Sequence, residues 1–189
     1  NKNWSNTANW PTTSGGSGGS SVPSTTDNVY FNGNGNGKCL IDVPASPGQI
    51  NIDSTYTDSI KLGSTLTVNS TYTQNGGVLW ASSYSITMKS SFTINKGTFR
   101  STSYRLLCQG AVTIKANTAT FLHNNGEVFF GGTLSISVPG TTSFYDCVIS
   151  FLSGFGNTIT LNANTVLTVD HLLTINTVNI NGPGVIDAH

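Results

Sequence analysis

The chain has 189 residues, a formal net charge of zero and only 8% charged side chains. This balance excludes electrostatic capture of nucleic acid or of an anionic membrane surface, because both need a basic excess; without an apolar run of roughly 20 residues, we also expect no membrane insertion. The 37% content of hydrophobic residues argues against intrinsic disorder, and the length favours one folded domain.

The first 21 residues predict an arm that precedes the folded body. Trp4 and Trp10 lie in this arm, and residues 12–21 read TTSGGSGGSS, which is typical of a flexible linker. We therefore expect an N-terminal arm and Gly/Ser linker over residues 1–21 and one domain over residues 22–189. The arm is free either to fold back on the body or to reach a neighbour, and its two tryptophans are candidate anchors for assembly.

The body opens with four short segments that predict the strands of one or two opening coils. These segments are VYFNG (29–33), KCLIDV (38–43), QINID (49–53) and SIKL (59–62). Val, Ile, Thr and the aromatic residues favour strands, whereas Asn and Gly favour turns, so we expect no long helix.

From residue 65 onward, apolar residues recur in three classes, with steps of 20–23 residues in the first and third classes. The first class holds Leu66/Val68, Ile86/Met88, Leu106/Cys108 and Val128/Phe130; the second holds Tyr72, Phe92/Ile94, Val112/Ile114, Leu134/Ile136 and Ile159/Leu161; the third holds Leu79, Phe99, Phe121 and Phe144. The two members of a pair lie two residues apart, which indicates a strand with one buried face. Turn-forming residues such as those at 75–77 and 95–97 separate the classes.

Three short strands per coil of about 20–23 residues predict an all-β fold, a right-handed parallel β-helix or β-solenoid. In such a fold each strand pairs with its equivalent in the next coil. An antiparallel β-sandwich is the alternative, but a sandwich has no reason to repeat the same residue classes in order. Residues 158–189 keep alternating to the end, so we expect seven or eight coils and an uncapped C-terminal end.

Four quoted stretches carry a family resemblance. NWSNTANW (3–10) followed by VPSTTDNVYF (22–31) resembles the opening of passenger-type parallel β-helices, found in autotransporter-like and giant repetitive bacterial cell-surface and fibre proteins. TSFYDCVISF (142–151) and TVLTVDHLLTINTVNI (165–180) resemble the repeats that follow in such proteins. The resemblance implies a secreted or surface-displayed β-solenoid with a scaffold, adhesive or fibre role, and it brings no catalytic residues.

The sequence offers no pattern for catalysis, a cofactor or a metal ion. Its eight acidic residues form no repeated or adjacent pair in the coil register, and Glu127 and Asp146 are expected in different phases of the coil. The histidines, His123, His171 and His189, lack the spacing of metal ligands. We therefore expect catalytic, cofactor-binding and metal residues to be absent.

The cysteines are expected in two kinds of environment. Cys108 stands where Met88 and Phe130 stand in the neighbouring coils, which predicts a buried side chain. Cys147 follows Asp146 in the opposite phase, which predicts an outward side chain. Cys147 is therefore a candidate for an intermolecular disulfide in an oxidising compartment.

These features favour a non-enzymatic extracellular structural protein. In this hypothesis a β-solenoid subunit stacks head to tail with copies of itself, or is linked by its arm, into a filament or surface layer. The alternative is a segment of a cell-surface adhesin that binds surface glycans through the exposed aromatic residues Trp80, Tyr84 and Tyr104. A carbohydrate-active enzyme is a third hypothesis, which the lack of paired carboxylates disfavours.

Overall fold

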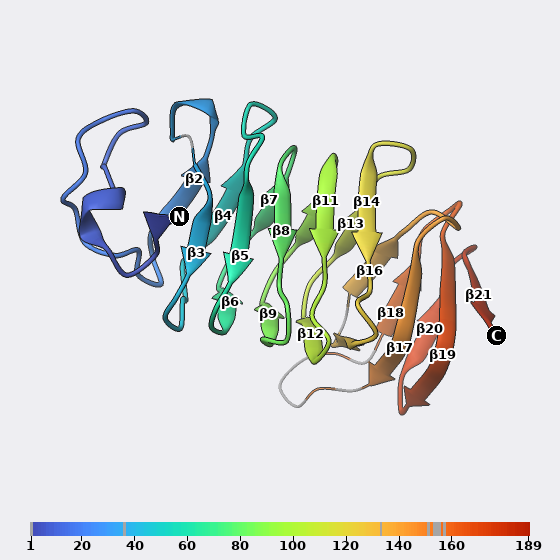
Figure 1. The fold of residues 1–189 in the computed structure, drawn as a ribbon. Helices are drawn as coiled ribbons and strands as arrows, with labels where there is room; N and C mark the ends of the chain where they lie inside the picture. Colours follow the sequence, from blue (N-terminus) through green and yellow to red (C-terminus); the bar gives the residue numbers. More distant parts are fainter. Residues whose placement is uncertain (1, 36, 133, 151, 153–155, 157) are drawn as a thin grey trace.

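The computed structural model of the chain describes residues 2–35, 37–132, 134–150, 152, 156 and 158–189. Its strands wind into a parallel β-solenoid of about seven turns, with three parallel sheets along its length and almost no helix (Figure 1). The predicted all-β solenoid with three strands per coil is therefore confirmed.

Each sheet collects the equivalent strands of successive turns. Sheet A contains β1 (Lys2–Asn3), β3 (Cys39–Ile41), β5 (Ser59–Leu62), β8 (Val78–Trp80), β11 (Gly97–Arg100) and β14 (Ala119–Leu122). Sheet B contains β2 (Asn28–Phe31), β4 (Gln49–Ile52), β7 (Tyr72–Gln74), β10 (Phe92–Ile94), β13 (Val112–Ile114), β16 (Leu134–Ser137), β18 (Thr158–Leu161) and β20 (Asn179–Asn181). Sheet C contains β6 (Leu66–Val68), β9 (Ile86–Met88), β12 (Arg105–Cys108), β15 (Glu127–Gly131), β17 (Ser143–Ser150), β19 (Val166–Asn176) and β21 (Val185–Ala188). Two short 3-10 helices are η1 (Thr7–Asn9) and η2 (Gly33–Gly35).

Residues of the same class stack directly above one another in the interior. Phe99 of sheet A pairs with Leu79 on one side and with Phe121 on the other, and Phe92 of sheet B pairs with Tyr72. All of these side chains are buried. Because one turn cannot cover its own apolar face, each turn depends on the next for its burial.

Gln74 is the largest of the buried polar side chains, which also include Ser101, Thr102, Thr142 and Thr165. The Tyr72 hydroxyl donates to its Oε1 at 2.8 Å, and its Nε2 donates to the carbonyl oxygens of Gly76, Gly77 and Thr98 at 3.0–3.2 Å. A fully buried amide is tolerated there because every polar atom has a partner.

The corner between sheets A and C disappears in the last turns. In the regular turns, the core position of sheet C comes seven positions after that of sheet A, as in the pairs Leu79/Ile86, Phe99/Leu106 and Phe121/Val128. Cys147, in contrast, comes only three positions after Phe144. Without residues for a corner, β17 and β19 run straight through as strands of 8 and 11 residues. Sheet A therefore ends at β14, and the first part of β17 covers it through Phe144, whose ring lies 5.1 Å from that of Phe121.

Candidate functional site

The N-terminal arm folds back and closes its own end of the solenoid. β1 pairs with β3 in parallel, and the Trp4 side chain behind it is only 1% exposed. The indole N–H of Trp10 donates to the Trp4 carbonyl oxygen at 2.7 Å, and the Trp10 ring contacts those of Trp4 and Phe31 at 4.6 and 6.4 Å. Of the two courses open to the arm, the structure therefore shows the folded-back one, in which Trp4 packs on its own body.

A hollow remains between the arm and the first turn. It has a volume of about 690 Å³ and is lined by residues that include Trp10, Tyr30 and Phe31. The arm therefore spans the end of the rod without filling it.

A short polar contact anchors the start of the arm. The backbone N–H and the hydroxyl of Ser5 donate to the two carboxylate oxygens of Asp42 at 3.0 and 2.6 Å. These hydrogen bonds lower the pKa of Asp42, because they stabilise its ionised form.

The Asp42 contact predicts an arm that loosens in acid. A carboxyl whose folded-state pKa is lowered stabilises the fold above the unfolded value of about 3.9, and this contribution is lost as the pH falls through the lowered pKa. We expect the protection factor of the Trp4 amide, which donates to the Leu40 carbonyl at 2.8 Å, to fall below about pH 4. Hydrogen exchange followed by NMR measures the protection of this amide. In the variant Asp42→Asn, exchange of the Trp4 amide should already be faster than in the wild type at neutral pH.

Asp53→Asn is the matched control for this prediction. The pKa of Asp53 is also lowered by hydrogen bonds, but its donors are the backbone and hydroxyl of Thr55 in the same turn. Equal acceleration of Trp4 exchange in both variants would show that Asp42 has no special role in holding the arm.

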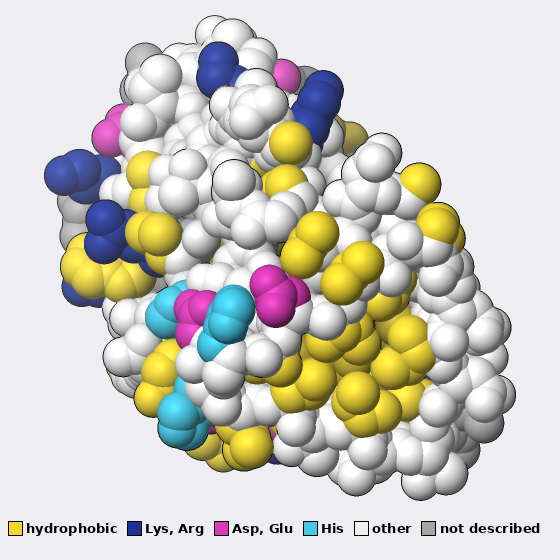
Figure 2. Space-filling view, turned by 90° about the vertical axis from the view of Figure 1, so that its right-hand side faces the viewer, with side chains coloured by type: hydrophobic (Ala, Val, Ile, Leu, Met, Phe, Trp, Pro, Cys, Tyr) yellow, Lys and Arg dark blue, Asp and Glu magenta, His cyan; other side chains and the backbone are white. Residues whose placement is uncertain are grey.

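The C-terminal end, in contrast, presents the interior of the solenoid to solvent. We define the C-terminal end face by the inward-pointing residues of the last turn, Leu173, Ile175, Ile180 and Ile186. Their partners one turn earlier are fully buried: Cys147, Ile149, Ile159 and Leu167. Ile175, however, is 44% exposed, since no further turn lies over it among the described residues. Figure 2 shows the resulting continuous hydrophobic area on this end of the molecule.

Further apolar side chains border the C-terminal end face. Leu172 and Val185 are 53% and 56% exposed, and Val178 packs at the margin. Monomeric proteins rarely expose contiguous apolar patches of this kind unless the patch contacts a partner.

Cys147 does not face outward, and that prediction is wrong. Its side chain is fully buried and pairs with Val128, because Tyr145 and Asp146 both point outward where the register shifts. Two successive outward residues are typical of a β-bulge, and they reverse the alternation that the sequence predicts. Burial raises the pKa of the Cys147 thiol to about 12, which makes it a poor candidate for an intermolecular disulfide. Cys108 is buried, as predicted.

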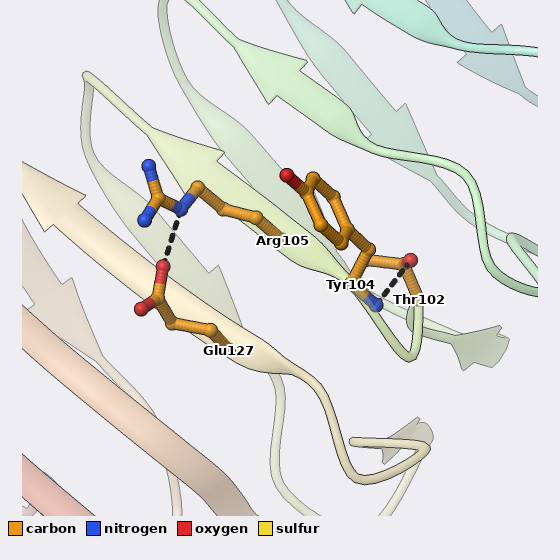
Figure 3. Close-up of polar contacts among 4 residues, drawn as sticks. All are labelled: Thr102, Tyr104, Arg105 and Glu127. Atoms are coloured by element: carbon orange, nitrogen blue, oxygen red, sulfur yellow. Dashed lines mark hydrogen bonds and ion pairs between the residues drawn. The ribbon is translucent and has the colours of Figure 1, made fainter.

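Glu127 and Asp146 lie side by side on β15 and β17, so the prediction that they fall in different phases is also wrong. The missing corner shortens the step between them to 19 residues. Each carboxylate nevertheless has its own partner: Arg105 binds Glu127 (Figure 3), and a ring nitrogen of His171 lies 2.7 Å from Asp146. Each of the two carboxylates therefore contacts a side chain of a neighbouring turn.

The histidines belong to the same corner region. The rings of His123, Tyr145 and His171 stack over three successive turns, with centroids 5.7 and 4.5 Å apart. Within the described parts of the chain, no group of three or more His, Cys, Asp or Glu side chains is placed to hold a metal ion. The stack is therefore best understood as packing between turns.

The three aromatic candidates for glycan binding have different surroundings. Trp80 is 42% exposed, but cations cover its ring: the Lys61 Nζ lies 4.9 Å and the Arg100 Cζ 5.7 Å from the ring centre. Tyr84 and Tyr104 occupy equivalent turns and are 38% and 68% exposed. The Tyr104 N–H donates to the Thr102 hydroxyl at 2.8 Å, which fixes the turn that carries its ring (Figure 3).

Charge is distributed unevenly along the chain. Residues 1–115 hold eight basic and four acidic residues, a formal charge of +4, whereas residues 116–189 hold four acidic residues and no Lys or Arg, a formal charge of −4. Because the chain advances along the solenoid axis, this asymmetry gives the rod oppositely charged halves.

Comparison of the chain with known protein families, with characterised proteins and with solved structures returned no match. Within the described residues, no helix is both long and apolar enough to cross a membrane. The function is therefore inferred from the two ends of the rod and from its outer faces.

Proposed function

We propose that this protein is a non-enzymatic structural subunit that stacks head to tail with copies of itself into a filament or surface layer. The observation that carries the proposal is the C-terminal end face, where Ile175 and its neighbours continue a buried core into solvent. An interface that resembles a core cut in half is typical of stable association between subunits.

Charge supports a head-to-tail arrangement of the copies. The C-terminal half carries −4 and the N-terminal half +4, so unlike ends attract and like ends repel. A contact between two different ends does not close on itself, and repeated contacts of this kind give open filaments.

The sheet edges are compatible with the same arrangement. Sheet B runs from β2 at one end to β20 at the other, and all its strands are parallel. In a head-to-tail arrangement, β2 of the second copy therefore meets β20 as a parallel strand, just as β18 does. In a tail-to-tail arrangement the second copy does not bring β2 to β20.

The arm enters the proposal in one of two ways. Trp4 and Trp10 either stay on their own body, so that the arm forms the docking surface, or transfer to the preceding copy and cover its C-terminal end face. The second route is an exchange of an identical element between copies. Deletion of residues 1–21 tests both ways together: assembly is lost if the arm makes the contact in either way, and it persists if the body of the rod alone makes the contact.

An extracellular location is part of the proposal. Its support is the resemblance of residues 3–10 and 22–31 to the opening of passenger-type parallel β-helices of bacterial surface proteins. Copies of the chain itself are the proposed partners.

Substitutions in the C-terminal end face test the proposal. We expect the wild-type chain to form linear assemblies in electron micrographs and a concentration-dependent series of larger species in sedimentation velocity. The variant Ile175→Asp should remain a monomer, because each association would bury a carboxylate without a partner. Added salt should weaken wild-type assembly, since it screens the attraction between the halves.

Leu122→Asp is the matched control. Like Ile175, Leu122 is an aliphatic residue with a half-exposed side chain, at 40%, but it lies on the outer side of sheet A at β14. It should assemble like the wild type. A wild-type chain that stays monomeric at every concentration, or equal assembly of the end-face variant, would refute the proposal.

A further inference from the structure

One outward-facing position of sheet A carries an unusual row of side chains. Lys61, Trp80 and Arg100 pair in register on β5, β8 and β11, which lie side by side in Figure 1. The Lys61 ammonium and the Arg100 guanidinium approach the indole at 4.9 and 5.7 Å from its centre. Since Trp80 remains 42% exposed, the outer edge of the indole faces solvent between two cations. We call these three residues the cationic row.

The charges of the cationic row are not neutralised. In the described parts of the chain, Arg105 is the one Lys or Arg residue in an ion pair. The other outward residues of β5, β8, β11 and β14 are uncharged: Ser59, Val78, Thr98, Thr120 and Leu122. The nearby carboxylates are engaged elsewhere, Asp42 by Ser5 and Asp58 by the backbone N–H of Gly37 at 3.1 Å.

We propose that the cationic row is a binding site for an acidic polysaccharide. Carboxylate and sulfate groups form charge-assisted hydrogen bonds with Lys and Arg, and a sugar ring packs against the exposed edge of an indole. Lys61 and Arg100 lie two turns apart, about 10 Å at the strand spacing of a sheet, so a chain laid along the solenoid axis presents spaced acidic groups to both. The +4 charge of residues 1–115 attracts such a chain to this half of the rod.

The composition of the row selects the class of ligand. A nucleic acid needs several phosphate contacts and a basic face, and an anionic membrane surface needs a cluster of four to eight basic residues. Two cations around one aromatic edge meet neither requirement. The two cations and the indole edge instead fit a polymer that carries a few widely spaced acidic groups and sugar rings with apolar faces. This ligand differs from the neutral glycans that exposed aromatic residues alone would favour, because the faces of the Trp80 ring are already occupied.

Calorimetric titration of the folded protein tests the proposal with three probes: polygalacturonate, heparin and neutral dextran. We expect wild-type binding to the first two and none to dextran, and the stronger of the two identifies carboxylate or sulfate as the acidic group. The variant Lys61→Gln/Arg100→Gln should lose affinity by about tenfold for each cation removed, about 100-fold in total. Trp80→Ala should weaken binding by about tenfold without changing its salt dependence.

Lys89→Gln/Lys115→Gln is the matched control, because it removes the same charge from two exposed lysines outside sheet A. This control should bind within about threefold of the wild type, since only long-range attraction is lost. Equal losses in both double variants would reduce the effect to general charge attraction and overturn the site. The proposed site would also be overturned if the wild type bound neither polygalacturonate nor heparin at low salt. Because the row lies on the side of the rod, these outcomes are independent of whether the ends associate.

Discussion

Replacement of Phe99 by alanine is expected to lower the free energy of unfolding by about 3–5 kcal/mol. Phe99 on β11 of sheet A is fully buried, and its ring contacts those of Tyr72, Phe92 and Phe121 at 5.9, 4.9 and 5.8 Å. Truncation removes these contacts and leaves a cavity that the stacked turns close only partly, because each is held in register by its hydrogen bonds. Chemical denaturation monitored by circular dichroism measures the loss.

Phe129→Ala is the matched control for this prediction. It deletes the same atoms from a partly buried phenylalanine on the outward side of β15, where the Arg105 guanidinium lies 5.3 Å from the ring. We expect a cost of about 1 kcal/mol there. A similar cost for both substitutions would contradict the stacked aromatic core.

Replacement of Trp4 by alanine is expected to open the N-terminal end of the rod, at a cost of about 3–5 kcal/mol in the stability of that end. Trp4 is 1% exposed, and Trp10 depends on it through their edge-to-face contact at 4.6 Å. Since a solenoid turn contacts only its neighbours, the damage should stay near the arm and the first turn. Hydrogen exchange should therefore accelerate in β2 and β3 and remain unchanged in β10 and β13.

Trp80→Ala tests whether the effect is specific to the arm. It removes an indole of the same size from the outer face of sheet A, where the ring is 42% exposed, so exchange in β2 and β3 should not change. Uniform acceleration throughout the chain in the Trp4 variant would mean that the arm is required for the whole rod and does not act as a local cover.

The two ends of the rod follow from one feature of solenoids. Every internal turn is covered by a neighbouring turn on both sides, so only the two end turns need another segment or another chain to cover their apolar side chains. At the N-terminal end Trp4 supplies this cover, while at the C-terminal end Ile175 remains 44% exposed among the described residues. The proposal of directional stacking rests on this difference.

The repeat was readable from the residues alone because strand alternation and turn spacing are local properties. Phe92 and Phe99 recur 20 residues after Tyr72 and Leu79, and the structure pairs them in register. The buried position of Cys108 follows from the same spacing. Periodicity therefore determined the fold class, the three sheets and most of the core.

The errors occur where the repeat is interrupted. Between Phe144 and Cys147 four corner residues are missing relative to the earlier turns, and the bulge at Tyr145 and Asp146 reverses the alternation. The sequence pattern assigns Cys147 to the surface, whereas the tertiary structure pairs it with Val128 in the core. An interruption in a repeat changes the register of everything after it, and only pairing with the previous turn shows how the register is restored.

By itself, the sequence determined the period, the identity of the core residues in the regular turns and the charge difference between the two halves of the chain. The tertiary structure decided that the arm folds onto its own body through Trp4, that Ile175 continues the core into solvent, and that Lys61 and Arg100 meet around Trp80. The physical reason is that a period is set by neighbours within one turn, whereas an end face or a row across strands exists only after distant turns have stacked.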